Sequence, residues 1–340
     1  HNATINQSVT SSDPNYSQSL PAISVSITDN DSAVVNFAPA AVSQAEGISP
    51  MAFTVTLSNP VASGVTLTLN SANGTATAAD YTPISGATVS FPASSAASQT
   101  VNVVIANDAL DEDDETFTLT LSGLTATGNV TLGTAAATGT ILDDDATPTL
   151  SITSPSQNEG NAGTSVMNFT VSLGAVSGRN VSFTRATADG TATVANNDYV
   201  AIASGSLSIP AGQSSVTIPV TINGNTVFEG DETFSVNLTG ITNATPGTLT
   251  GTGTIVEDDQ QPTTTTITSD LPDPSVVGQP YTVSVNVAAV TTSPTGTVTI
   301  SDGTASCGPV TLTAGTAPNS TASCSLTSTT AGAKTLTASY

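Results

Sequence analysis

Residues 111–121 read Asp-Glu-Asp-Asp-Glu-Thr-Phe-Thr-Leu-Thr-Leu, an acidic run that passes directly into an alternating segment. Residues 229–238 read Glu-Gly-Asp-Glu-Thr-Phe-Ser-Val-Asn-Leu and repeat this pattern. In the alternating half every second residue is apolar, which predicts a β-strand with one buried face. Carboxylates repel one another when they are crowded. We therefore expect a chain that gathers them twice before a strand to gather them around a cation.

The two runs belong to an internal repeat of about 115 residues. Glu46 and Glu159 lie 113 residues apart, and Phe117 and Phe234 lie 117 apart. A repeat of this length is a domain with its own core, rather than one unit of a solenoid. Alternating apolar runs recur between turns roughly every 8–12 residues, and no segment shows a helical period. The sequence therefore predicts an all-β chain of tandem antiparallel β-sandwiches, arranged as an elongated string.

The pattern divides the chain into four parts. Residues 32–146 and 147–261 are the two complete repeats. Residues 1–31 hold two strand-like runs and the triplet Asp29-Asn30-Asp31, which match the end of a repeat, so we expect a piece of a longer polypeptide. Residues 262–340 carry few acids and a different set of strand-like runs. This last part is expected to be another sandwich that lacks its last strand.

The charge balance restricts the partners. The chain has 26 acidic and 3 basic residues, for a net charge of −23, which repels nucleic acid and anionic membranes. Twenty of the acids lie in the two repeats, mostly in tight clusters, whereas a surface that is acidic only for solubility would scatter them among lysines. No apolar stretch approaches the ~20 residues that span a bilayer. We expect neither nucleic-acid binding nor membrane insertion.

Catalysis is not expected, and no catalytic residue is assigned. The chain has one histidine, His1, and it has no Gly-x-Ser-x-Gly elbow, phosphate-binding loop or dinucleotide fingerprint. A glycosidase also uses paired carboxylates, but these acids lack aromatic neighbours that would stack on a sugar. Cys307 and Cys324 have strand-like flanks and fit a disulfide in an oxidising compartment, with two buried free thiols as the alternative.

The elements that the two repeats share resemble the Calx-beta domain, a calcium-binding sandwich module of sodium–calcium exchangers, integrin β4 and large bacterial surface proteins. They are an early Glu-Gly, a Gly-Thr-Ala stretch with Asp-Tyr, a Glu-x-x-Glu-x-Phe run and a closing Gly-Thr-Ile with acids. Their first residues are Glu46, Gly74, Glu112 and Gly139 in one repeat and Glu159, Gly190, Glu229 and Gly253 in the other. The last part, with Asp302-Gly303-Thr304 and the two cysteines, resembles bacterial Ig-like repeats of cell-surface proteins.

The resemblance implies that loops at one end of each sandwich bind Ca²⁺, which takes about 6–8 oxygen ligands. The first repeat offers Glu46, Asp80, Asp108, Glu112, Asp143, Asp144 and Asp145. The second repeat offers Glu159, Asp198, Glu229, Glu257, Asp258 and Asp259. Asn225 replaces Asp108 in the second repeat, so fewer or weaker ions are expected there. The remaining acids of the first run are interpreted as solvated outer-face residues: Asp111, Asp113, Asp114 and Glu115.

The leading hypothesis is a calcium-binding stalk or spacer segment of a large extracellular bacterial surface or adhesin-like protein, in which Ca²⁺ stiffens domains and junctions. Its partners would be the neighbouring domains of the same chain, with other copies of itself or cell-surface ligands left open. One alternative is a filament subunit that assembles by strand exchange between incomplete terminal modules. Another is a calcium-sensing regulatory module, which the absence of membrane segments and the Ig-like part disfavour.

Overall fold

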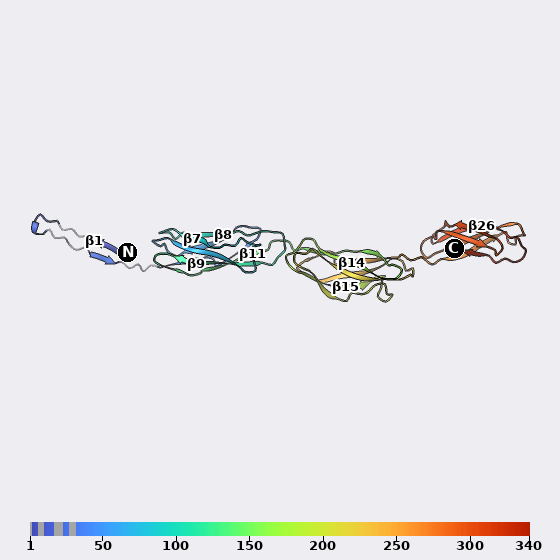
Figure 1. The fold of residues 1–340 in the computed structure, drawn as a ribbon, viewed down its shortest axis with the longest axis horizontal. Coiled ribbons are helices and arrows are strands. Elements are labelled where there is room, and N and C mark those ends of the chain that lie inside the picture. Colours follow the sequence, from blue (N-terminus) through green and yellow to red (C-terminus); the bar gives the residue numbers. More distant parts are fainter. Residues whose placement is uncertain (1, 6–9, 17–22, 27–31) are drawn as a thin grey trace.

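The computed structural model describes residues 2–5, 10–16, 23–26 and 32–340, and most of their regular structure is β-strand. Figure 1 shows three β-sandwiches that follow one another along the long axis of the molecule. The predicted all-β architecture of tandem sandwiches is confirmed. None of the helices in the described part of the chain is long and apolar enough to cross a membrane.

Ahead of the sandwiches, β1 (Asn2–Ile5) pairs antiparallel with β2 (Ile23–Ser26). The short 3-10 helix η1 (Pro14–Tyr16) lies between them in the sequence. The acidic triplet Asp29-Asn30-Asp31 lies outside the described residues.

The first sandwich has two sheets, with strand orders β10-β3-β5-β8 and β4-β11-β9-β6-β7. Most neighbouring strands are antiparallel. However, β3 is parallel to β10 and β4 is parallel to β11, because the chain crosses from one sheet to the other between β3 and β4. The strands are β3 (Ser32–Phe37), β4 (Ala41–Ala45), β5 (Met51–Leu57), β6 (Val65–Asn73), β7 (Ala87–Phe91), β8 (Gln99–Val103), β9 (Glu115–Thr125), β10 (Asn129–Leu132) and β11 (Ala136–Leu142).

The second sandwich repeats this topology, with the sheets β17-β14-β12-β19 and β13-β20-β18-β15-β16. Its parallel pairs are β12 with β19 and β13 with β20. The strands are β12 (Thr149–Ile152), β13 (Ser156–Asn158), β14 (Gly163–Leu173), β15 (Val181–Asp189), β16 (Gly205–Ile209), β17 (Ser215–Gly224), β18 (Glu232–Thr242), β19 (Thr245–Pro246) and β20 (Thr250–Val256).

The third sandwich is smaller, with the sheets β21-β22-β26-β25 and β24-β23-β27. Its core is mainly aliphatic, with Val283, Val285, Val298 and Ile300 fully buried. The structure joins Cys307 of β24 to Cys324 of β26 by a disulfide. The strands are β21 (Thr264–Leu271), β22 (Pro280–Ala288), β23 (Thr297–Ser301), β24 (Ser306–Thr311), β25 (Thr313–Ala314), β26 (Asn319–Thr327) and β27 (Thr337–Ser339).

A stack of two aromatic rings lies in the core of each repeat. In the first sandwich Tyr81 stacks on Phe117, with ring centroids 4.5 Å apart and an interplanar angle of 15°. In the second sandwich Tyr199 stacks on Phe234 at 4.4 Å and 13°. All four side chains are buried. Each tyrosine directly follows an aspartate, and each phenylalanine ends a Glu-x-x-Glu-x-Phe run. Burial of the rings therefore draws these two acidic segments together at one end of the sandwich.

Glycine on the neighbouring strand makes room for the stacked phenylalanine. A Cβ atom at Gly139 of β11 would overlap the ring carbons of Phe117. A Cβ atom at Gly253 of β20 would likewise overlap the ring carbons of Phe234. The glycine of the Gly-Thr-Ile run is therefore needed for the close approach of strand and ring, rather than for a turn.

We predict that Gly139→Ala destabilises the first sandwich by about 1–3 kcal/mol, because the added methyl group overpacks the core. Thr138→Ala, on the opposite face of the same strand, is the matched control and should cost clearly less. Thermal unfolding of both variants measures the difference. Equal Tm values for the two variants would contradict this account of the core.

Candidate metal centre

Parallel strand pairing brings the early Glu-Gly and the closing acids of each repeat to the same place. In the first repeat β4 and β11 lie in register, with Ala45 opposite Leu142. The Glu46 amide continues the ladder and donates to the Leu142 carbonyl at 3.0 Å. Both strands end there, so Glu46 and Asp143 leave the sheet together. The pairing of β13 with β20 has the same effect in the second repeat.

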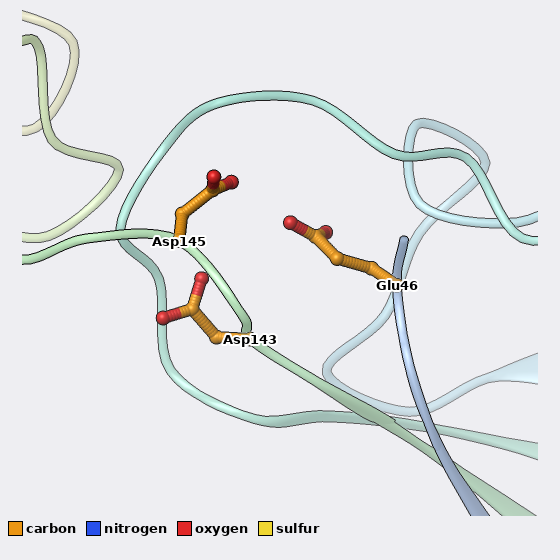
Figure 2. A group of neighbouring side chains, drawn as sticks. All are labelled: Glu46, Asp143 and Asp145. Atoms are coloured by element: carbon orange, nitrogen blue, oxygen red, sulfur yellow. The ribbon is translucent and has the colours of Figure 1, made fainter. Parts of the chain in front are cut away.

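The first acidic cluster consists of Glu46, Asp143 and Asp145. Each contributes one carboxylate oxygen, and these oxygens all lie within 4.8 Å of one another. Figure 2 shows the three carboxylates converging, Glu46 from one segment and both aspartates from another. Glu46 is only 8% exposed, and its Oε1 and the Asp145 Oδ2 are buried without a hydrogen-bond partner. Buried oxygens without donors are costly for a protein.

A second cluster in the same repeat consists of Asp80, Glu112 and Glu115, again with oxygens within 4.8 Å of one another. Thr77 fixes Asp80, because its amide and its hydroxyl both donate to Asp80 Oδ2, at 2.6 and 2.9 Å. Glu115 begins β9, and Glu112 lies in the loop before it. The stacked rings fix the positions of both segments, since Tyr81 directly follows Asp80 and Phe117 lies two residues after Glu115.

The second repeat holds two equivalent clusters. One consists of Glu159, Glu257 and Asp259, and the other of Asp198, Glu229 and Glu232. Glu159 and Asp198 are buried, and the Asp259 Oδ2 is buried without a hydrogen-bond partner. The Thr193 amide donates to Asp198 Oδ2 at 2.6 Å, as Thr77 does in the first repeat.

Crowding in these clusters disfavours the charged form of the glutamates. Burial raises the pKa of Glu46 to about 7, and the negative charges of its neighbours add to the effect. Burial and neighbouring acids likewise raise the pKa of Glu159 to about 7. The pKa values of Glu115 and Glu232 are raised to about 7, first by burial and then by Asp80 and Asp198 respectively.

Three residues predicted as ligands lie outside the clusters. Asp258 Oδ1 accepts a hydrogen bond from the Gly160 amide at 3.0 Å. Asp144 lies against the equivalent Gly47, where a Cβ would come within 2.8 Å of its Oδ2. Asp108 Oδ1 accepts the amide of Leu110 at 2.8 Å, while its charge still raises the pKa of Glu46 and Glu112. In this structure Asp108 and Asp258 hold loop amides by hydrogen bonds, and Asp144 lies beside Gly47.

Two cluster residues, Glu115 and Glu232, were not among the predicted ligands. The interpretation of Glu115 as an outer-face residue is not what the structure shows. Strand alternation could have indicated this, since Glu115 precedes the buried Phe117 by two residues and so lies on the same face. Asp111 is only 3% exposed, so the outer-face interpretation is wrong for it as well. The other two residues of that interpretation, Asp113 and Asp114, are exposed, as expected.

The clusters of the second repeat have more protein donors. The Asn225 side-chain amide donates to Glu159 and to Glu229. Glu257 accepts the amides of Gly230 at 2.9 Å and Asp259 at 2.7 Å. These and other amides outweigh the effect of burial and keep the pKa of Glu257 below its usual range. Fewer free oxygens remain here than in the first repeat.

Asp302 in the third sandwich shows how a buried carboxylate is satisfied without a metal. Its oxygens accept the amides of Ala305 at 2.6 Å and Thr304 at 2.7 Å, and the hydroxyl of Tyr281 at 2.9 Å. The hydrogen bonds from Ala305, Ser328 and Thr304 hold the pKa of Asp302 well below the usual range. The orphaned oxygens of Glu46, Asp145 and Asp259 have no such partners.

The donor chemistry of the clusters fits a hard divalent cation. All ligands in the four clusters are carboxylate oxygens, the type that Ca²⁺ prefers, and no sulfur or imidazole is involved. In the described part of the chain, ion pairs join Arg179 to Asp111 and Asp113, and neither acid belongs to a cluster. The clusters are therefore candidate metal sites that the protein itself does not neutralise.

Comparison with known proteins gives two family matches. The profile of the Calx-beta domain matches residues 28–145 and 143–268, and that of the bacterial Ig-like domain (group 3) matches residues 267–340. No curated protein matches the chain.

Three solved structures are among those similar to it. CBD12 from CALX1.2 shares 19% identity and covers 65% of this chain and 99% of its own, with a TM-score of 0.32. The calcium binding domain CBD12 of CALX1.1 shares 17% sequence identity. The match covers 66% of this chain and 99% of that structure, with a TM-score of 0.32. The apo-form Calx CBD1 domain shares 25% sequence identity. The match covers 33% of this chain and 98% of that structure, with a TM-score of 0.31.

The raised glutamate pKa values predict how the metal-free protein responds to pH. Between about pH 4.5 and 7 the folded state binds more protons than the unfolded chain, so stability falls as the pH rises through this window. We predict a higher Tm in chelator at about pH 5 than at about pH 7.5. Calorimetry measures this difference in Tm. Glu46→Gln should reduce the slope of Tm against pH, whereas the exposed control Asp114→Asn should not. A Tm that rises across the window would refute the assignment.

Proposed function

The chain belongs to the Calx-beta domain family, and we propose that it is a non-enzymatic, Ca²⁺-binding spacer segment of a large extracellular bacterial surface protein. The observation that carries the proposal is the group of buried carboxylate oxygens without donors: Glu46 Oε1, Asp145 Oδ2 and Asp259 Oδ2. A cation would satisfy these oxygens and remove the repulsion among their neighbours.

Calcium suits the clusters better than magnesium does. Ca²⁺ accepts many oxygen ligands in irregular geometry, whereas Mg²⁺ demands a near-ideal octahedron and keeps several of its waters. Six carboxylates in the first repeat would hold the ions: Glu46, Asp80, Glu112, Glu115, Asp143 and Asp145. Bound calcium would supply positive charge and direct bonds to these side chains, and it would hold four segments of the chain together.

The position of the clusters favours a mechanical role. Asp145 lies four residues before β12, and Asp259 lies five residues before β21, so each set of loops adjoins a domain boundary. If Kd lies near ~0.1–1 mM and free calcium near ~1 mM, each ion would contribute about 0.4–1.4 kcal/mol. We infer that calcium orders these loops and stiffens the chain at its boundaries.

Two features support the extracellular setting. Residues 267–340 match a bacterial Ig-like domain, and this domain contains the Cys307–Cys324 disulfide. Disulfides persist in oxidising compartments. The partners that we propose are the neighbouring domains of the same chain, with other copies of the chain or cell-surface ligands as further candidates.

The direct test of calcium binding is thermal melting of the whole chain in calcium and in chelator. We predict that calcium raises Tm by a few degrees, as expected for about 0.4–1.4 kcal/mol per ion. Magnesium at the same concentration should give a smaller shift. The double variant Glu46→Gln/Glu112→Gln should lose the shift of the first sandwich only. The same Tm in calcium and in chelator would rule out the proposal.

We further predict that the first repeat binds calcium more tightly than the second. Asn225→Asp replaces an amide donor by a carboxylate between Glu159 and Glu229, and should tighten binding several-fold in the second repeat. Asp108→Asn makes the reciprocal change and should weaken the first repeat. Calorimetric titration with CaCl₂ measures both. If neither substitution changes the affinity, the asymmetry does not arise at this position.

A further inference from the structure

One acid of the first repeat takes part in a contact between domains. Asp111 belongs to the acidic run but to none of the clusters, and its side chain is only 2% exposed. Thr147 of the interdomain segment donates to its Oδ1 at 3.1 Å, and Ser177 of the second sandwich donates to its Oδ2 at 3.4 Å. The Arg179 guanidinium lies 3.5 Å from Oδ1. The carboxylate therefore joins the first sandwich, the connecting segment and the second sandwich.

Backbone pairing reinforces this contact. Asp111 and Ser177 form an isolated parallel β-bridge across the boundary. The Gly178 amide and the Ser177 hydroxyl both donate to the Asp111 carbonyl, at 3.1 and 3.2 Å. Ser177 is 1% exposed. The two domains thus share a single β-bridge whose two residues are shielded from solvent.

Arg179 is anchored in its own domain and reaches the other. One of its guanidinium nitrogens donates to Asn243 Oδ1 at 2.6 Å, and its amide donates to the Ser177 hydroxyl at 3.0 Å. Its Nε lies 3.1 Å from the exposed Asp113 without forming a hydrogen bond, so solvent weakens that pair. The buried contact with Asp111 is the one that matters, because removing either charge would leave the other poorly compensated.

The fit at this boundary is close. A Cβ atom at Gly178 would overlap the side chain of Glu112, so the second domain packs directly against a residue of the Asp80–Glu112–Glu115 cluster. The contacts across this boundary include an ion pair and backbone pairing between the two domains.

The residues of this contact are not part of the repeat itself. Where the first repeat has Asp111 and Asp113, the second has Phe228 and Gly230. Where the second repeat has Ser177, Gly178 and Arg179 between its strands, the first has Val61-Ala62-Ser63. The contact is therefore particular to this pair of domains, and it does not recur at the next boundary.

The boundary before the third sandwich is held differently. In the described part of the chain, the hydrogen bonds that cross it come from the side chain of Gln261. Its Oε1 accepts the amides of Thr291 at 2.9 Å and Thr292 at 3.4 Å, and its Nε2 donates to the Thr292 hydroxyl at 2.8 Å. One half-buried side chain in the connecting segment restrains motion much less than an ion pair to a buried carboxylate with backbone pairing.

We propose that Asp111, Ser177 and Arg179 form a metal-independent latch that holds the first two sandwiches as one rigid unit. The second boundary bends more freely, so in the absence of calcium the string is a stiff pair followed by a hinge. The latch does not require calcium, since the Arg179 guanidinium supplies the positive charge that faces Asp111. Calcium acts on the clusters beside it.

Interdomain distance measurements in chelator test the latch. The two native cysteines are joined in a disulfide, so introduced cysteines can carry spin labels in the full chain. Ser90→Cys with Thr217→Cys reports the first boundary, and Thr217→Cys with Thr282→Cys reports the second. In EGTA we expect a narrow distance distribution for the first pair and one at least about twofold broader for the second, since mobile domains are the default for weak interfaces.

Variants then assign the stiffness to the latch. Arg179→Gln should broaden the first distribution about twofold, toward the width of the second. Arg185→Gln removes the same charge inside the second sandwich, where Arg185 bonds to the Gly205 and Ser206 carbonyls, and should leave the distribution unchanged. Gly178→Ala should broaden it too, through the clash with Glu112.

Three outcomes would overturn the latch. The first is a broad first-boundary distribution in EGTA, and the second is one that narrows only when calcium is added. That second result would still be compatible with the proposed calcium sites. The third is an unchanged distribution in both Arg179→Gln and Gly178→Ala, with circular dichroism showing that both variants are folded.

Discussion

The repulsion among partly buried carboxylates is the constraint on which both repeats depend. Six acids of the first repeat converge in two clusters, and burial and mutual repulsion raise the pKa of Glu46 and Glu115 to about 7. The chain answers this constraint in three ways. Asp302 is surrounded by hydrogen-bond donors, Asp111 is paired with Arg179, and the clusters keep buried oxygens that have no donor. Only the third arrangement calls for a cation.

The core determines where the acids meet. The stack of Tyr81 on Phe117 pulls the Asp-Tyr segment and the start of β9 to one end of the sandwich, and the parallel pairing of β4 with β11 delivers Glu46 and Asp143 to the same end. The stacked rings and the paired strands are part of the sandwich itself. The acidic segments therefore cannot be moved apart without disturbing the fold. The acidic loops also adjoin the domain boundaries.

Much of this could be predicted from the sequence, because it depends on local periodicity and on a domain-sized repeat. Alternation gave the strands, and the doubled acidic signature indicated the cluster regions. The incorrect predictions concern residues whose environment is set by contacts in the folded structure. Burial of Asp111 depends on Ser177 and Arg179, which lie more than 60 residues away in another domain. Glu115 was misjudged because its charge was weighed above its position on the inward face of β9. The parallel edge pairs likewise depend on a crossing between sheets that alternation cannot reveal.

The central claim is that the clusters bind calcium through their own carboxylates. Anomalous diffraction from crystals of this chain grown with calcium tests it most directly. The account predicts anomalous peaks among Glu46, Asp143 and Asp145 and among Asp80, Glu112 and Glu115, with weaker peaks at the equivalent acids of the second repeat. Well-ordered clusters without peaks at millimolar calcium, or peaks only at exposed acids such as Asp113, would contradict it.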